Sequence, residues 1–336
     1  MILSLSIFGC EQETIVFPDI ANVERKISVS ATLDTDGGQF QVFVSKVISL
    51  PEYKHPFRNI PEVRTGRVLL YEDGELIFEA EHDFDLIQVL DREEEIKRSF
   101  LSCEGVSAKA GSVYRLEVAV DGYDPVSAIA TMPHAPAVKS IHADISAAAP
   151  KHRVYYIADV ITGHGLYRLY YPLHIVIEDQ PESSGYYAIQ AVCYYYDDNA
   201  TETAVEALIV GSDDWSILAD NPLLENEQDI WAEEPYEMYA FTPFLFNNKT
   251  FANSVREFTF YIPLPDDNLI EQQGISLTQQ QILVKQITKE TWDVYSAYNT
   301  GGLDFFNSEP ITVPSNIKNG YGNFSLSNTV KFNTSI

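Results

Sequence analysis

Apolar and polar residues alternate with a period of two along much of the chain. In the first part, this alternation covers residues 26–33, 40–47, 67–71, 76–80, 112–120 and 126–131. Successive side chains of a strand point to opposite faces, so this period predicts half-buried β-strands. Asp73-Gly74 lies between two of these segments, and both residue types tolerate the positive φ of a tight hairpin turn. The pattern predicts an antiparallel first domain that is rich in hairpins.

Short strands separated by turns over about 110 residues are typical of an immunoglobulin-like β-sandwich. We expect such a sandwich over residues 25–133. The charged segment 91–98 is expected to form either a short solvated helix or a loop. Pro133 and Pro136 then mark a linker, so a fragment that ends at Pro133 is expected to fold alone.

The second part of the chain continues the alternation and adds one helix. Strands are expected at residues 153–161, 166–177, 186–196, 204–210, 239–246, 256–263 and 275–287. Thr288 is a good N-cap for a helix that reaches about Asn299, and Gly301 supplies a stop. The chain is thus predicted to be mainly β. An immunoglobulin-like sandwich is followed, over residues 137–336, by a second β-rich, sandwich-like domain with one short C-terminal helix.

Residues 315–324 combine turn-forming and apolar positions near the C-terminus. Gly320 and Gly322 permit sharp turns, whereas Ile317 and Phe324 are poor choices for an exposed tip. We expect the apolar side chains of Ile317, Tyr321 and Phe324 to pin the segment to a core and Gly320 to have a positive φ. The alternative is a recognition loop, since ordered irregular segments often carry binding.

Residues 1–10 form a short apolar run that ends in Gly9 and Cys10. Small residues before a cleavage point mark a secretory signal peptide, and a Cys directly after the cut resembles the bacterial lipobox. We expect Cys10 to be acylated, with residues 11–24 as a tether, because several acyl chains anchor a protein stably where one does not. No Lys or Arg precedes Cys10, so we expect the natural start to lie upstream. The alternative is that residues 1–10 form an ordinary first strand.

The net charge of the chain limits which classes of molecule it can bind. The 336 residues carry a net charge of −27. Nucleic-acid binding needs a basic surface that releases counterions, so this class is excluded. Residues 169–248 contain no Lys or Arg, and their acids favour either a solvated face or a surface for divalent cations or a basic partner. No apolar run reaches the roughly 18 residues of a transmembrane helix. Cys103 and Cys193 fall in different predicted domains, so no disulfide is expected.

The sequence contains no motif of an established catalytic or phosphate-binding site. Its 7 histidines, among them His142 and His174, are scattered singly. Without metal-ligand spacing, we expect surface or core roles for them. The segment that begins with Asp34 and Asp36 resembles the start of a calcium loop. Ser45 would stand where that loop needs a bidentate carboxylate, so we expect a plain turn.

Two groups of residues are weaker candidates for binding. The paired acids that suit Ca²⁺ are Asp197, Asp198, Asp213, Asp214, Asp266 and Asp267. Tyr194, Tyr195 and Tyr196 could form a platform on which sugars stack, although alternating tyrosines more often line a half-buried sheet face. Apart from Ca²⁺ at these acids, no cofactor is expected.

Several motifs resemble one family of Bacteroidetes lipoproteins, the domain of unknown function 4249. The C-terminal motifs are residues 288–295 (TKETWDVY), Glu309-Pro310 and residues 315–324 (SNIKNGYGNF). The earlier motifs, in the same order, are Cys10, Tyr71-Glu72-Asp73-Gly74, Tyr114-Arg115-Leu116-Glu117-Val118 and Thr131-Met132-Pro133. The acids that follow Cys10 also resemble the surface-export signal of such lipoproteins. The resemblance implies a lipid-anchored outer-membrane protein, exposed at the cell surface, often associated with TonB-dependent uptake and without known catalytic residues.

These observations lead to a functional hypothesis. We expect a non-catalytic surface lipoprotein, not an enzyme, that is a binding or accessory subunit of a TonB-dependent nutrient uptake system and contacts its β-barrel transporter. The alternative is a structural subunit of an outer-membrane protein assembly or secretion complex. A surface hydrolase that uses acidic side chains is a third hypothesis, for which the sequence offers no catalytic motif.

Overall fold

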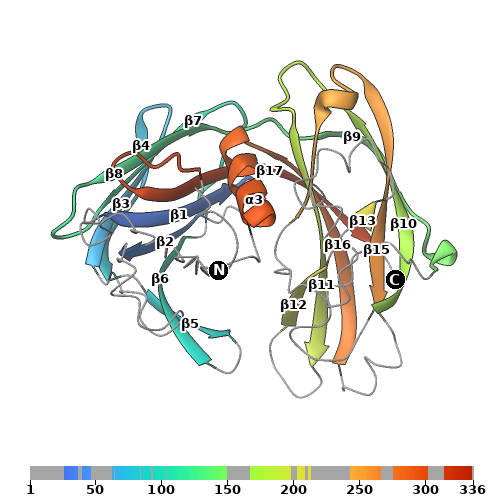
Figure 1. Ribbon diagram of the computed structural model, residues 1–336, viewed down its shortest axis with the longest axis horizontal. Coiled ribbons are helices and arrows are strands. Elements are labelled where there is room, and N and C mark those ends of the chain that lie inside the picture. The colour runs from blue at the N-terminus through green and yellow to red at the C-terminus, as the bar shows by residue number, and fades with distance from the viewer. Residues whose placement is uncertain are drawn as a thin grey trace, which may run out of the picture.

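The computed structural model shows two β-rich lobes and a strand that joins them (Figure 1). The structure describes residues 26–36, 40–46, 63, 65–83, 85–91, 94–103, 105–149, 167–197, 203–208, 211–212, 243–265, 275–301 and 314–334. The predicted signal segment, the tether and the strand expected at 153–161 lie outside these residues. Within them, the chain is mainly β with one α-helix near the C-terminus, so the predicted fold class is confirmed.

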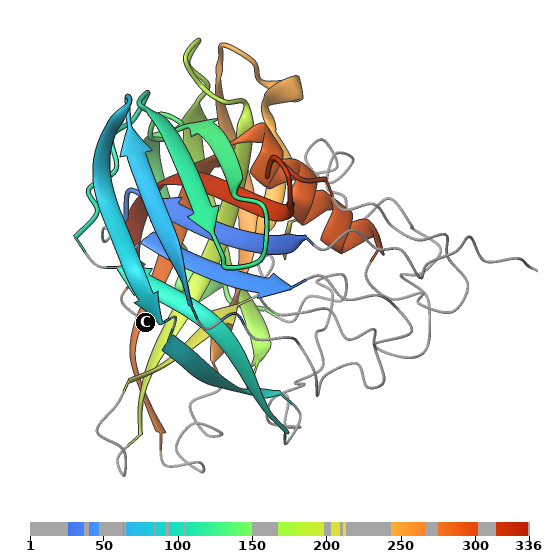
Figure 2. The ribbon, with the colours of Figure 1, turned by 90° about the vertical axis from the view of Figure 1, so that its left-hand side faces the viewer.

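The first lobe is built from two layers of strands. One layer contains β1 (Ile27–Asp34), β2 (Phe40–Lys46), β5 (Asp85–Asp91) and β6 (Glu94–Cys103). The other is a four-stranded sheet in the order β4 (Glu75–Asp83), β3 (Thr65–Glu72), β7 (Val113–Ala119) and β8 (Val126–Thr131). Alternate residues such as Val29, Leu70 and Leu116 are buried in one core between the layers. In Figure 2 the four-stranded sheet lies nearest to the viewer, with β1 and β2 behind it.

The second lobe repeats the two-layer arrangement. One sheet has the order β13 (Gly211–Ser212), β15 (Val255–Pro265), β10 (Tyr167–Glu178) and β9 (Ala137–Ala143). The other layer contains β12 (Thr203–Leu208), β11 (Tyr186–Asp197), β14 (Phe244–Asn247) and β16 (Ile275–Ile287). Ile175, Phe246, Phe258 and Ile282 are buried in the core of this lobe. The rings of Phe246 and Phe258 lie 5.2 Å apart, so aromatic contact adds to the stabilisation from burial.

Helix α3 (Lys289–Gly301) follows β16 directly. Thr288 caps it as predicted, because its hydroxyl accepts a hydrogen bond from the amide of Thr291 at 3.3 Å. The Trp292 ring then packs 5.4 Å from the Tyr186 ring at the start of β11, which fixes the helix against the sheet. None of the helices in the described residues is long and apolar enough to span a membrane.

Strand β17 (Tyr321–Thr334) belongs to both lobes. Its first half runs parallel to β1, and this pairing ends with Asp34 opposite Ser327. From Ser327 onward, β17 runs antiparallel to β16. The result is a nine-stranded sheet in the order β12-β11-β16-β17-β1-β2-β6-β5, with β14 attached to β11. Backbone pairing along one strand therefore joins the two lobes.

The parallel pairing requires β17 to approach β1 closely. Gly322 has a φ of +104°, and a Cβ at this position would overlap the carbonyl oxygen of Val29. The positive φ expected at Gly320 is wrong, because this conformation occurs instead at Asn319, with a φ of 63°, and at Gly322. Asn tolerates the left-handed region better than most residues. Gly320 is limited by space, since a Cβ there would lie 2.7 Å from a methyl group of Val126.

The apolar residues of the tail complete the core of the first lobe. Ile317, Phe324 and Leu326 are buried in the same cluster as the side chains of β1, β3 and β7. The packed tail predicted from the sequence is therefore confirmed for Ile317 and Phe324 and wrong for Tyr321, which is 46% exposed. The domain boundary at residue 133 stays a prediction, and the first sandwich draws core residues from far beyond it.

A polar cluster marks the point at which β17 changes partner. The Asp34 carboxylate accepts hydrogen bonds from Ser327 Oγ at 2.6 Å and Thr329 Oγ1 at 2.7 Å. It also accepts one from Lys285 Nζ, on β16, at 3.2 Å. Strands of both lobes thus supply hydrogen-bond partners to the half-buried carboxylate of Asp34. These bonds fix the register at the point where β17 leaves β1 and joins β16. Asp34 is the last residue of β1 and holds this joint, whereas the turn predicted after it lies partly outside the described residues and stays a prediction.

One local prediction is wrong and one strand is not predicted. Within the charged segment 91–98, the described residues are neither helix nor loop, because β5 ends at Asp91 and β6 begins at Glu94, which is paired with it. Strand β9, directly after the linker, has no counterpart in the sequence prediction. In both places, pairing with a neighbouring strand outweighs the weak local preference of the residues. The Asp73-Gly74 hairpin is confirmed, with φ values of 49° and 89°.

We expect the substitution Phe324→Ala to lower the free energy of unfolding by about 3 kcal/mol, because it removes a fully buried ring and leaves a cavity. Tyr321→Ala on the same strand is the control, since Tyr321 is 46% exposed; its effect should stay within about 0.5 kcal/mol. Urea unfolding of both variants measures the difference. Equal stability of the two variants would contradict a structural role for this end of β17.

Candidate functional site

A buried tyrosine holds the four-stranded sheet of the first lobe against its preceding loop. The hydroxyl of Tyr114 accepts a hydrogen bond from the backbone amide of Lys109 at 2.8 Å and donates one to Glu72 at 3.1 Å. Lys109 Nζ pairs with the same carboxylate at 3.0 Å. Burial, more than the neighbouring carboxylate, raises the pKa of Tyr114 to about 12. This backward contact is the tyrosine corner of immunoglobulin-like sandwiches, and it makes the sheet a fixed platform.

The exposed face of this platform carries a row of four side chains, one from each strand. Tyr71 on β3 is paired with Leu76 on β4 and with Arg115 on β7. Arg115 is in turn paired with Ile129 on β8. Leu76 is 48% exposed and Ile129 is 64% exposed. We call these four residues the outer row.

The centre of the outer row is a cation–π pair. The Arg115 guanidinium lies 3.7 Å from the centroid of the Tyr71 ring. Glu117 forms an ion pair with Arg115 and accepts a hydrogen bond from the Tyr71 hydroxyl at 3.4 Å. The two side chains therefore form a flat, partly charge-balanced unit, with exposed apolar side chains at both ends.

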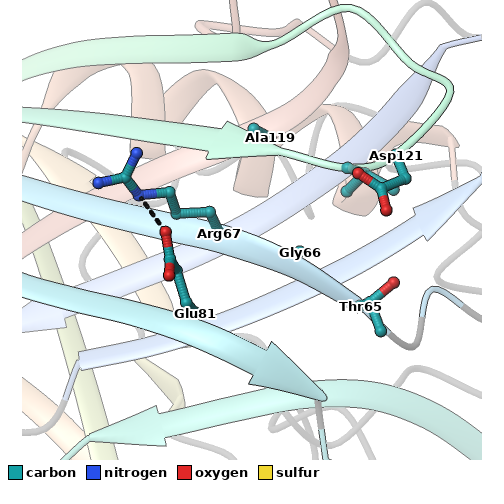
Figure 3. A pocket seen from close by; sticks show the side chains of 7 residues that line it. Thr65, Gly66, Arg67, Glu81, Ala119 and Asp121 are labelled. Carbon is teal, nitrogen blue, oxygen red and sulfur yellow. Dashed lines mark ion pairs between the residues drawn. The ribbon is translucent and has the colours of Figure 1, made fainter.

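A shallow depression of about 400 Å³ lies on the same sheet (Figure 3). It is lined by Thr65, Gly66, Arg67, Glu81, Ala119, Val120 and Asp121. The Arg67 guanidinium is shared by two carboxylates, Glu79 at 2.5 Å and Glu81 at 3.2 Å. The hydrogen bonds that Arg67 donates to Glu79 are the main cause of a raised pKa of Arg67. The depression thus contains the ion-paired Arg67 and the carboxylate of Asp121 beside the small residues Gly66 and Ala119. This lining suits polar contacts with a ligand more than catalysis.

A second polar cluster closes one end of the second lobe. Asp179 is buried and accepts hydrogen bonds from Tyr187 Oη at 2.8 Å, Asn248 Nδ2 at 2.9 Å and the Asn253 amide at 2.9 Å. Burial acts to raise the pKa of Asp179, but the hydrogen bonds from Asn253, Asn248 and Tyr187 outweigh it, so the pKa is lowered. Burial also raises the pKa of Tyr187. The cluster holds the loop after β10 against the loop after β14, so its role is structural.

The structure describes few of the site residues predicted from the sequence. Cys10, Asp198, Asp213, Asp214, Asp266 and Asp267 lie outside the described residues. Asp197 is the last residue of β11, where its backbone pairs with Ile275. Tyr194 lies within the sheet and donates a hydrogen bond to Gln281 on β16 at 3.3 Å. Tyr195 and Tyr196 continue the same strand after a register shift. Calcium and sugar binding at these residues stay predictions.

Sequence reasoning missed the outer row and the Asp179 cluster. The residues of each belong to different strands or loops, so only the register brings them together. The alternation over residues 67–71 and 112–120 predicts which residues of one strand share a face. The alternation does not indicate which strands are neighbours in the sheet.

The family model described as "Domain of unknown function (DUF4249)" matches residues 13–333. No curated protein matches the sequence. The solved structure of the N-terminal CBM22-1-CBM22-2 tandem domain from Paenibacillus barcinonensis Xyn10C aligns over 78% of this chain and 84% of that chain. The identity is 10% and the TM-score is 0.11. A score this low supports no inference about fold or function.

We expect Asp179→Asn to lower the free energy of unfolding by about 2 kcal/mol at pH 7, because the buried donors lose a charged acceptor. A lowered pKa in the folded state means that the carboxylate stabilises the fold above its ordinary pKa of 3.8. This stabilisation is lost as the pH falls below that value. We therefore measure the free energy of unfolding in urea at pH 7 and at pH 3. Its decrease between the two pH values should be smaller for the variant than for the unchanged protein. An equal decrease in the two proteins would contradict the prediction. Glu182→Gln is the control, because Glu182 is an exposed carboxylate in the same loop.

Proposed function

Because the chain belongs to the family described as "Domain of unknown function (DUF4249)", we propose that it is a non-catalytic lipoprotein of the outer membrane. In this proposal, Cys10 carries the lipid anchor and the lobes lie at the cell surface. The partner is the β-barrel transporter of a TonB-dependent nutrient uptake system. The lipobox-like segment and the resemblance of the C-terminal motifs to Bacteroidetes lipoproteins support this assignment.

The outer row is the observation that carries the proposed binding role. Leu76 and Ile129 stand exposed on a sheet whose opposite face already fills the core. Tyr and Arg are the residue types that contribute most to protein interfaces, and a stacked pair loses little side-chain freedom on binding. An exposed apolar patch with a polar rim is typical of a protein-binding surface. The row therefore fits a protein partner, and Glu117 supplies part of its polar rim.

A second candidate function is a structural subunit of an outer-membrane assembly or secretion complex. The shared strand β17 favours it, because a continuous sheet holds the exposed faces of both lobes in one fixed relation. Deletion of the gene separates the two functions. Loss of a transporter accessory would impair growth on particular nutrients, whereas loss of an assembly subunit would disturb many envelope proteins.

We expect Ile129→Asp to reduce the recovery of the β-barrel partner at least tenfold after crosslinking in cells and affinity purification of the anchored protein. A charge buried in a desolvated interface without a partner costs several kcal/mol. Val255→Asp is the matched control, because Val255 is a 56% exposed apolar residue on the other lobe. Its recovery of the partner should equal that of the unchanged protein.

Quantitative mass spectrometry of the purified fractions measures recovery. Absence of any outer-membrane β-barrel from the unchanged sample would contradict the transporter partner. Equal losses with both variants would contradict the outer row as the contact.

A further inference from the structure

Two histidines face each other on the outer surface of the second lobe. His142 in β9 and His174 in β10 are directly opposite in the antiparallel register. Their rings are stacked, with centroids 6.4 Å apart and planes 17° from parallel. Leu173 and Ile175, on either side of His174, are buried in the core. Alternation along the strand therefore directs the imidazoles to the solvent side of the sheet.

The next strand orients one of these rings. His174 Nδ1 lies 3.2 Å from Thr259 Oγ1 and 3.6 Å from Glu257 Oε1, both on β15. A histidine that ligates a metal usually has its other ring nitrogen bonded to a carboxylate or another acceptor. With a proton on Nδ1 directed to these oxygens, the lone pair of His174 Nε2 is available to a cation.

A second carboxylate stands beside the other ring. Asp144 follows β9 directly, and its Oδ1 accepts hydrogen bonds from Ser146 Oγ at 2.6 Å and the Ala147 amide at 3.2 Å. Asp144 and His142 interact electrostatically. Each ring thus has one carboxylate that interacts with it, Asp144 for His142 and Glu257 for His174, and two negative charges favour a positive ion. Strand β9 is the edge of its sheet, so water has access to complete a coordination shell.

From this geometry we infer that His142 and His174 bind one divalent cation of the Zn²⁺, Ni²⁺ or Cu²⁺ class through both imidazoles. These ions prefer imidazole nitrogen, whereas Ca²⁺ and Mg²⁺ prefer oxygen. In the residues that the structure describes, no three His, Cys, Asp or Glu side chains form a metal-binding group. Water therefore supplies the remaining ligands.

A change of side-chain rotamer can bring the two rings to a shared ion. Bonds of about 2.1 Å place the two ligating nitrogens within about 4 Å of each other. His142 is exposed, so its ring can turn toward His174 between staggered rotamers without disturbing the core. The site stands independently of the proposed partner, because it lies on the other lobe.

Calorimetric titration of the whole protein with Zn²⁺ tests the site. We expect His142→Ala and His174→Ala each to weaken binding at least tenfold, and Glu257→Gln to weaken it about tenfold through loss of ring orientation. His134→Ala, an exposed histidine of the other lobe, should bind Zn²⁺ like the unchanged protein. Thermal melting without metal should show that the exposed substitutions leave the fold intact.

Electron paramagnetic resonance with one equivalent of Cu²⁺ gives an independent measurement. The unchanged protein should show coupling to two imidazole nitrogens, and His142→Ala to one. No binding of Zn²⁺ by the unchanged protein would overturn the inference. Undiminished binding by His142→Ala and His174→Ala, or a Cu²⁺ spectrum without two coupled imidazoles, would overturn it as well.

Discussion

The parallel pairing of β17 with β1 is the constraint on which the rest of the structure depends. Without this strand, β1 would present unpaired backbone groups at an edge, and the first core would lack Phe324 and Leu326. The pairing is possible only because Gly322 has no side chain to meet the Val29 carbonyl. Since the same strand continues along β16, each lobe depends on residues that also belong to the other.

The shared strand also sets how the two proposed surfaces are held. Besides the shared sheet, each lobe has one four-stranded sheet that does not contain β17. The outer row of Tyr71 and Arg115 lies on one of these sheets, and the pair of His142 and His174 lies on the other. Where β17 changes partner, Asp34 accepts hydrogen bonds from Lys285 and Ser327, and these bonds fix the register of the strands. A partner that contacts the two surfaces would therefore meet them in a fixed relation.

Much of the fold follows from the sequence, and most of the site does not. The period of two identifies the strands around Val29 and Leu116, and Asp73-Gly74 identifies a hairpin, because these signals are local. The exchange of partners by β17 is not local, since one strand pattern fits a parallel or an antiparallel neighbour equally well. His142 and His174 appear isolated in the sequence for the same reason. Only the pairing of β9 with β10 brings them together, and β9 itself lacks a strong strand pattern.

The most direct test of the shared strand is scanning calorimetry of the whole chain. If each lobe needs β17, the lobes lose their folded states together, and the thermogram should contain one transition whose calorimetric and van't Hoff enthalpies agree. Substitution at Gly322 with Val should lower the temperature of that single transition as a whole. Two separate transitions, with only one of them shifted by the substitution, would show that the lobes fold independently and would contradict the account.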